Sequence, residues 1–414
     1  MQDTSAGYRL SPLQERAWRL SQRDGHDGAV AALFALGRDV DPVRVRGAFA
    51  RLADAFELLR ARIERVPGMR DGVQYIDDDA RCHFAPEAAC EGDVAIDALL
   101  ARHLSGPAAQ AATLAAALIA MPDGTRRLLL RAPATIADAA SLRLLAAHLL
   151  ADARDVGADA DRAALDQNAL DQNDLDQYID IAEWLREVLE AEDTASGRAH
   201  WTRELVPESV ALALPFERTG DGVPQIARLR HVPAAGRLEA WARRAADADT
   251  HLGAWALAAW QRTLAVWLGD RAFSVAVEFD GRKFDELREV IGPMARHIPL
   301  RLPAAAAGGD ADTHARDIAE AVATAHRFQE YFDAESALGA HARTPASFAY
   351  AWRDTVAGQA AALDEWGGEE PFKLRLILHT GAAPRLDIDY DHGVYADGDI
   401  VCLQAQLLAR HLRG

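Results

Sequence analysis

One stretch in the first half of the chain limits the possible folds more than any other. It consists of an apolar run over 128–132, a short loop over 133–138, and apolar residues that recur at Leu142, Leu145 and Leu149. The run predicts a buried strand, and the later spacing of three and four residues predicts a helix. Asp138 and Ser141 are candidate N-caps of that helix. The sequence therefore predicts a strand, a tight loop and a helix at the heart of a mixed α/β core.

Size and composition favour a large globular chain of two domains or lobes. The 414 residues are 50% hydrophobic and 26% charged, which is usual for a globular protein with a full core. The formal net charge of −18 argues against nucleic acid and against an anionic membrane as partners, because both would be repelled over most of the surface.

The cysteines and the apolar segments favour a cytoplasmic protein. Only Cys82, Cys90 and Cys402 are present, with no C-x-x-C spacing, which suits a reducing compartment better than a disulfide scaffold. We expect no metal site, because His83 beside Cys82 lacks further ligands at short spacing. No signal-peptide pattern and no apolar run of membrane-spanning length occur.

Two segments near the N-terminus carry clear local signals. Ser11 precedes a helical pattern in which Leu13, Ala17 and Leu20 share one face. Residues 29–36 read as a buried strand, and Asp41-Pro42 then starts a helix with an apolar stripe. The second half repeats this layout, with a helical stripe over 257–267 and an alternating strand over 273–279.

Several of these segments resemble the condensation domains of nonribosomal peptide synthetases. The opening motif of that family, Ser-x-x-Gln-x-Arg-x-Trp-x-Leu, is matched by residues 11–20, including Trp18. A later block over 290–301 is similar to the family's Ile-Gly and Pro-Leu-Arg motif, with Arg296 and His297 in place of Asn and Thr. The family's loop reads His-His-x-x-x-Asp-Gly. Here the same register holds Pro133, Ala134, Asp138 and Ala139, so the aspartate is kept and both histidines are replaced.

The resemblance implies an α/β (α+β) fold of two chloramphenicol-acetyltransferase-like lobes, arranged as a V-shaped pseudo-dimer with a tunnel between them. We expect the N-terminal lobe at 1–160, an Asp-rich repeat linker at 161–177 and the C-terminal lobe at 178–414. The linker prediction comes from its tandem Leu-Asp-Gln pattern, whose period of five residues matches no packed helix.

The resemblance also implies a degenerate site. No catalytic residue is assigned, because Pro133 and Ala134 replace the histidines while Asp138 remains; His297 is a candidate substitute base. In the family an arginine pairs with the loop aspartate, so we expect Arg60, with Arg62 second, to brace Asp138. The residues expected to line the tunnel for the substrate and its phosphopantetheine arm are Trp18, Thr135, Ser141, Arg282, Arg296 and Arg301.

The resemblance implies a role in nonribosomal peptide or hybrid polyketide biosynthesis. Acyl or peptidyl carrier proteins would deliver substrates on phosphopantetheine, with no cofactor bound by the chain itself, which we expect to be monomeric. Because alanine cannot act as a base, the first reading is a non-catalytic scaffold that holds a carrier protein, another synthetase module or a tailoring enzyme. The alternatives are an active noncanonical acyltransferase or cyclisation-type enzyme, and a ligand-binding protein that reuses the cleft.

Overall fold

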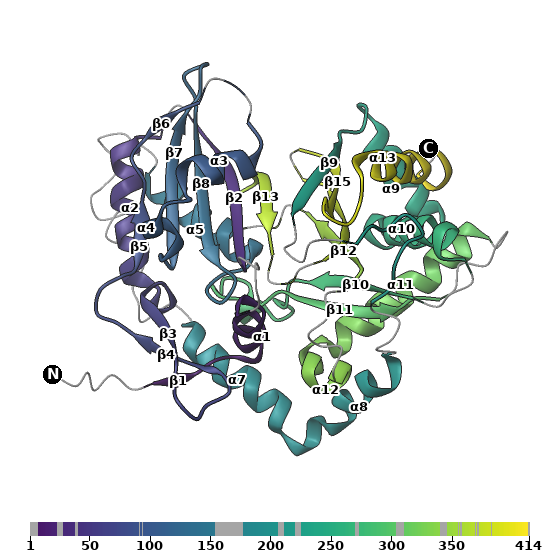
Figure 1. Ribbon diagram of the computed structural model, residues 1–414, viewed down its shortest axis with the longest axis horizontal. Helices are drawn as coiled ribbons and strands as arrows, with labels where there is room; N and C mark the ends of the chain where they lie inside the picture. Colours follow the sequence, from purple (N-terminus) through teal and green to yellow (C-terminus); the bar gives the residue numbers. More distant parts are fainter. Residues whose placement is uncertain are drawn as a thin grey trace.

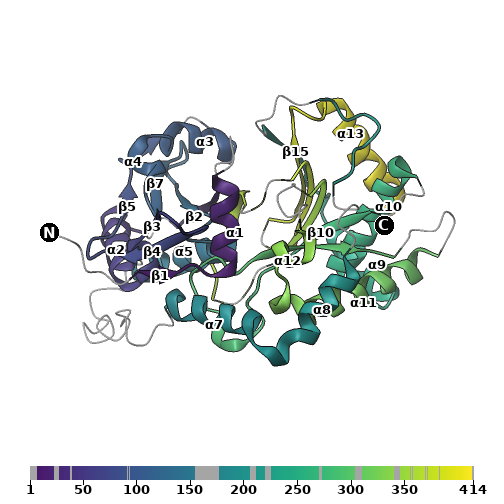
Figure 2. The ribbon, with the colours of Figure 1, turned by 60° about the horizontal axis from the view of Figure 1, so that its bottom comes forward.

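A computed structural model describes the chain apart from residues 1–6, 23–27, 38–39, 91, 93, 154–176, 206–210, 220–224, 270–272, 304–309, 340–345, 355, 357, 369, 371, 382 and 413–414. Two lobes lie side by side, each built around a mixed sheet, with helix α1 (Pro12–Ser21) between them (Figures 1 and 2). The predicted two-lobed α/β architecture is therefore confirmed.

The first lobe is centred on a six-stranded sheet in the order β13-β2-β8-β7-β5, with β6 also paired to β7. Its central strands β2, β8 and β7 are antiparallel, and Ala29 of β2 lies opposite Pro133 of β8. The strands of this sheet are β2 (Ala29–Leu36), β5 (Cys82–Phe84), β6 (Ala88–Ala89), β7 (Leu114–Ala120), β8 (Arg126–Pro133) and β13 (Ala362–Gly367).

Helices cover both faces of this sheet, which explains why its central strands are apolar without alternation. Leu114, Ala116 and Leu118 of β7 face one core, and Ala115 and Ala117 face another. The helices of the first core are α2 (Pro42–Ala55) and α5 (Ala139–Ala153), and those of the second are α3 (Ile96–His103) and α4 (Pro107–Gln110).

The second lobe holds a six-stranded sheet in the order β11-β10-β12-β14-β15-β9. Its strands are β9 (Ile226–His231), β10 (Ser274–Phe279), β11 (Arg296–Arg301), β12 (Phe348–Arg353), β14 (Leu374–His379) and β15 (Arg385–Asp391). One face packs in a common core with helices α9 (Arg237–Asp247), α10 (Leu252–Leu268), α11 (Ala311–Phe328) and α13 (Asp397–Gln406). Charged side chains occupy the other face, because Leu386 and Ile388 of β15 alternate with Asp387 and Asp389.

A small sheet and several helices complete the structure. Strands β1 (Tyr8–Arg9), β4 (Gly72–Ile76) and β3 (Ala61–Arg65) form the small sheet. The remaining helices are α7 (Tyr178–Glu190), α8 (Ala195–Glu204), α12 (Ala334–Leu338), the 3₁₀ segments η1 (Glu57–Arg60), η3 (Glu192–Thr194), η5 (Asp285–Leu287) and η6 (Gln329–Tyr331), and the π-helix η8 (Leu407–His411). Within the described ranges, no helix has both the length and the apolar character needed to cross a membrane.

The predicted helix starts at Ser11 and Asp41 are confirmed. The Ser11 side chain accepts a hydrogen bond from the backbone N–H of Gln14, whose own side chain returns to Ser11, and this reciprocal pair is a capping box. Asp41 caps α2 through the backbone N–H of Val43. The predicted repeat linker falls on residues that, except for Gln177, lie outside the described part of the chain.

Strand β13 comes from late in the sequence but belongs to the sheet of the first lobe. It pairs antiparallel with β2, opposite Ala31 and Val30 near its end (Figure 1). Helix α7 also packs against the first lobe, because Tyr178, Ala182 and Leu185 are buried in the core of α2 and α5. The boundaries at 160 and 178 stay predictions, but two segments that follow them join the first lobe.

Strand β13 is the crossover strand between the lobes, and its last residue provides a test of the pairing with β2. Gly367 has φ +82°, and an added Cβ would lie 2.1 Å from the carbonyl oxygen of Ala29. Gly358 also has φ +82°, but a Cβ added there would have nothing within 4 Å. We expect Gly358→Ala to cost about 1 kcal/mol through its backbone alone, and Gly367→Ala to cost roughly 1–3 kcal/mol more because β13 must move away from β2. Urea denaturation of both variants measures the difference, and equal losses would contradict the tight contact.

Candidate functional site between the lobes

The loop that organises the site is a tight turn between β8 and α5. The backbone N–H of Ala134 donates to the carbonyl of Gly28 at 2.6 Å, and the Pro133 carbonyl accepts from Ile136 and Ala137 at 2.9 and 3.1 Å. Asp138 then caps α5, because its Oδ1 accepts from the backbone N–H of Ser141 at 2.7 Å. The sequence prediction of strand, loop and capped helix is confirmed, with Asp138 as the cap and Ser141 inside the helix.

Asp138 forms a buried ion pair with Arg282 of the second lobe. Nη1 of Arg282 lies 2.8 Å from Oδ2 of Asp138, and Nη2 lies 3.1 Å from Oδ1. Both side chains are almost completely enclosed, with exposed fractions of 2% and 3%. The backbone N–H groups of Met294 and Ala295 each donate to Oδ2 at 2.9 Å. These bonds therefore hold the loop of the first lobe against the segment of the second lobe that precedes β11.

The pKa of Asp138 reflects this environment. Burial alone would raise the pKa of the carboxyl, but the positive charge of Arg282 and the hydrogen bonds from Arg282 and Ser141 outweigh burial and lower it to about 2. Asp138 is therefore ionised at neutral pH. Its charge and lone pairs are engaged by structural donors, so it acts as a structural anchor and has no lone pair directed at a substrate.

Ser141 extends the same network across the lobe interface. Its Oγ lies 2.8 Å from the carbonyl oxygen of Gly292, and the Gly292 N–H donates back to it at 3.0 Å. Tyr178 donates its O–H to the carbonyl of Pro293 at 2.8 Å. A Cβ on Gly292 would lie 1.9 Å from the Tyr178 ring, so this approach requires glycine.

The predicted brace from Arg60 is wrong. Arg282 and not Arg60 pairs with Asp138, and the buried Nε of Arg60 has no hydrogen-bond partner in the described part of the chain. Arg62, the second candidate, instead pairs with Glu64 and Asp77. The sequence reading placed the partner within the first lobe, whereas the fold supplies it from across the interface.

A cavity of about 480 Å³ lies between the lobes on the α1 side of the loop. The loop contributes Ala134, Ala137 and Asp138 to its wall, and β11 contributes Arg296 and His297. The cavity is also lined by Glu15, Arg16, Trp18, Arg19, Arg65, Arg70, Asp333, Glu335 and Glu370. Ala134, which by the resemblance of the loop stands where a histidine is expected, thus places a methyl group in the wall of this cavity.

A second cavity of about 750 Å³ lies on the other side of the same loop. Ala139 and Ala140 contribute to its wall, and Ala295 lines both cavities. Tyr350 and Arg353 of β12 and Glu365 of β13 are also part of the lining. Both volumes are in the range of small-molecule sites. The loop therefore separates two interlobe spaces, which is the placement expected for the two sides of a tunnel.

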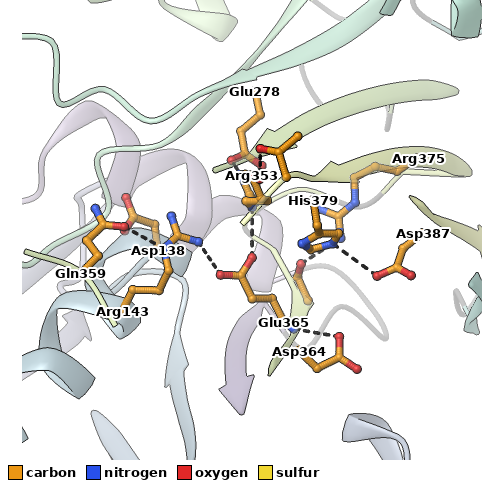
Figure 3. A network of polar contacts seen from close by, with 12 residues as sticks. Asp138, Arg143, Glu278, Arg353, Gln359, Asp364, Glu365, Arg375, His379 and Asp387 are labelled. Atoms are coloured by element: carbon orange, nitrogen blue, oxygen red, sulfur yellow. Dashed lines mark hydrogen bonds and ion pairs between the residues drawn. The ribbon is translucent and has the colours of Figure 1, made fainter. Parts of the chain in front are cut away.

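A network of charged residues lies beside the second cavity and joins the lobes (Figure 3). Glu365 of the crossover strand pairs with Arg143 of α5 and, at 3.1 Å, with Arg353 of β12. Arg353 also pairs with Glu278 of β10. Burial alone would raise the pKa of Glu365, but Arg143, Arg353 and His379 lower it to about 2.

The same strand bonds to the charged face of the second sheet. Asp364 lies 2.8 Å from both Arg228 and Arg230 of β9. These arginines also pair with Asp389 and Asp387 of β15. Sequence reasoning missed this network, although alternation of charged and apolar residues along 385–390 was a signal for a charged sheet face.

His297 lies in the α1-side cavity and is 2% exposed. Its Nε2 is 3.3 Å from Oε2 of Glu278, and its ring contacts Phe372 with a centroid distance of 4.6 Å. A carboxylate at this distance can orient an imidazole, so the geometry allows His297 a role as a base or a purely structural one.

The other predicted tunnel residues fall into two groups. Trp18 and Arg296 line the α1-side cavity. Thr135 does not, although its carbonyl accepts a hydrogen bond from Gln14 at 3.1 Å, and Arg301 lies apart from both interlobe cavities in a surface groove beside α8 and α11. Among the residues that the structure describes, no group of three or more His, Cys, Asp or Glu is arranged to hold a metal ion.

Comparison with known proteins assigns the family. A family model described as the condensation domain matches residues 4–335, so the chain belongs to the condensation domain family. Its relatives include AMB antimetabolite synthetase AmbE of Pseudomonas aeruginosa, 30% identical over 73% of this chain, and surfactin synthase subunit 1 of Bacillus subtilis, 25% identical over 72%. The aligned region spans only 14% and 8% of these two long proteins.

Solved structures share the fold at low sequence identity. The first condensation domain of the CDA synthetase is 17% identical with a TM-score of 0.77, and the match covers 99% of this chain and 96% of that one. The epimerization domain from the third module of tyrocidine synthetase B is also 17% identical, with a TM-score of 0.76 and coverage of 99% and 97%. These likenesses confirm the predicted fold and show that structures described as different domain types share it.

The pairing of Asp138 with Arg282 instead of Arg60 gives a matched pair of variants. Arg282→Gln leaves the Asp138 carboxylate buried without its counter-charge, and we expect a loss of about 3–5 kcal/mol of unfolding free energy. Arg60→Gln removes no ion pair with any residue that the structure describes, and we expect a loss below about 1 kcal/mol. Chemical denaturation compares the two variants. A larger loss in Arg60→Gln would contradict the Arg282 pair and support the expected pair of Arg60 with Asp138.

The low pKa of Asp138 also predicts a pH dependence. Because folding lowers the pKa of this carboxyl from its ordinary 3.8 to about 2, its stabilisation is complete above pH 3.8 and is lost as the pH falls towards 2. We expect the stability advantage of the wild type over Asp138→Asn to shrink by on the order of 2 kcal/mol between pH 5 and pH 2. Denaturation midpoints of both proteins across this range measure it, and a constant advantage would rule out the low pKa.

Proposed function

We propose that the chain is a condensation-like domain of nonribosomal peptide or hybrid polyketide biosynthesis that holds carrier-tethered acyl or aminoacyl groups between its lobes without forming an amide bond by the usual base-assisted route. Membership of the condensation family and the two cavities on either side of the loop support the first part. The position of Ala134 in the cavity wall supports the absence of base-assisted amide formation, because a methyl group cannot take a proton from an attacking amine.

The loop itself supports a scaffolding role. The sequence holds no histidine between His103 and His148, so no neighbouring loop residue can replace the missing imidazole. Pro133 has no backbone N–H and a fixed φ, which stiffens the turn at the point where the family has its first histidine. The loop is nevertheless fully anchored by Asp138 and Arg282. Such a domain keeps a cleft that receives a phosphopantetheine arm. It can thereby hold a carrier protein, another synthetase module or a tailoring enzyme.

Mass spectrometry of carrier proteins tests this function. A donor carrier loaded with an acyl group and an acceptor carrier loaded with an amino acid are incubated with the protein. We expect the acyl-loaded carrier to bind more tightly than the unmodified carrier, and the intact masses of both loaded carriers to stay unchanged. Binding is measured by titration. Failure of either carrier to bind would overturn the proposal, and transfer of the acyl mass to the acceptor would overturn its non-catalytic part.

Restoring one histidine is an informative variant in the same assay. We expect Ala134→His to bind carriers as the wild type does and still to give no peptide product, because Pro133 and Ala139 also depart from the family's loop. Peptide formation by this single variant would contradict the view that the turn is remodelled.

A second candidate function is an altered acyl transfer that uses His297. The observation in its favour is that His297 shares a cavity with Ala134 and lies 3.3 Å from Glu278. Under this alternative, wild-type protein transfers the acyl group and His297→Ala does not, whereas transfer that is unaffected by His297→Ala would exclude this histidine.

A further inference from the structure

Arg296 is a buried cation in the wall of the α1-side cavity. It is 5% exposed, and its Nη1 donates a hydrogen bond of 2.6 Å to the backbone carbonyl of Gln329. Its Nε is buried without a partner, and no carboxylate of the described residues lies within the 4.0 Å of an ion pair. Burial lowers the pKa of this guanidinium, with a partial offset from the charge of Glu330. A buried guanidinium without a counter-ion is costly, so its presence calls for an explanation.

Glu330 and Asp280 are the carboxylates whose charge acts on Arg296, and both lie beyond ion-pair distance. Oε1 of Glu330 accepts a hydrogen bond from Lys283 at 2.7 Å, while its buried Oε2 has no hydrogen-bond partner in the described part of the chain. The carboxylates that line the cavity have other partners: Glu15 pairs with Arg186 and Arg19, Glu370 with Arg16, Glu335 with Arg19 and Arg70, Asp138 with Arg282, and Asp333 caps α12. Arg296 therefore supplies a positive charge in the cavity wall with which no lining carboxylate forms an ion pair.

We propose that Arg296 binds a carboxylate on the acyl or aminoacyl group held in this cavity, so that the domain selects substrates that carry a free acid. This inference rests on the proposed function, because the group must enter on its carrier arm. The Nη2 of Arg296 has no hydrogen-bond partner among the described residues, so it is the donor available to a ligand. A guanidinium matches a carboxylate in charge and in planar geometry.

Two acyl amides of amino-pantetheine, in which an amine replaces the terminal thiol, distinguish this selectivity from binding of the arm alone. One carries a butanedioyl group with a free carboxylate, and the other carries a 4-oxopentanoyl group, in which a methyl ketone replaces the acid. Neither contains phosphate, so the arm's own phosphate cannot produce the preference. Calorimetry reports binding. We expect the wild type to bind the acid roughly 10- to 100-fold more tightly, the range for a hydrogen bond to a charged group.

Two arginine variants on the same strand assign the preference. Arg296→Gln is expected to bind both amides with equal affinity, whereas Arg301→Gln, which lies outside both interlobe cavities, keeps the preference. Thermal melting confirms that both variants are folded. A preference that survives Arg296→Gln, or its loss in Arg301→Gln alone, overturns the assignment.

The affinities of the wild type alone distinguish failure of the carboxylate inference from failure of the proposed function. Equal affinity of the wild type for the acid and the ketone overturns the carboxylate inference and leaves the proposed function in place, because the arm still binds. No binding of either amide at millimolar concentration overturns both. A preference for phosphopantetheine over pantetheine that depends on Arg296 would assign the residue to the phosphate and overturn the carboxylate inference.

Discussion

The buried pair of Asp138 and Arg282 is the interaction on which the site depends. It joins the loop of one lobe to the segment before β11 of the other, and four further hydrogen bonds, from Ser141, Met294 and Ala295, complete the shell of Asp138. Burying two charges is costly, and good geometry only offsets that cost. The benefit is positional: the loop and both neighbouring cavities keep a fixed geometry even though the loop carries no base. The loop therefore keeps a fixed shape with a methyl group at position 134.

Charged pairs are a large part of the lobe interface, and they set how the two halves meet. The inner face of the second sheet presents Arg228, Asp387 and Asp389, and the crossover strand brings Asp364 and Glu365 to them. Charged pairs are specific in direction, so they fix one arrangement of the lobes where an apolar face would tolerate several. Within this compensated interface, Arg296 stands out as a cation without a carboxylate in the described residues.

Much of the fold could be predicted from local patterns. The cap at Ser11, the proline start at Asp41 and the apolar run into the loop all use short-range physics, and the structure reproduces them. The partner of Asp138 could not be predicted in this way, because an arginine near in sequence and one brought close by folding are equally plausible before the lobes are placed. The pairing of β13 with β2 was missed for the same reason. The resemblance supplied the Asp138 position but assigned its counter-charge to the wrong lobe.

The crossover strand has a consequence for biogenesis. Strand β2 (Ala29–Leu36) is synthesised long before β13 (Ala362–Gly367), which pairs with its outer edge. Until β13 has been synthesised, one side of the nascent sheet exposes unpaired N–H and C=O groups, which are templates for wrong partners. Completion of the first lobe must therefore wait for the second. For the same reason, a fragment that ends between the lobes would expose the unpaired edge of β2. A chimera of two relatives would need to take β13 from the same parent as the N-terminal lobe.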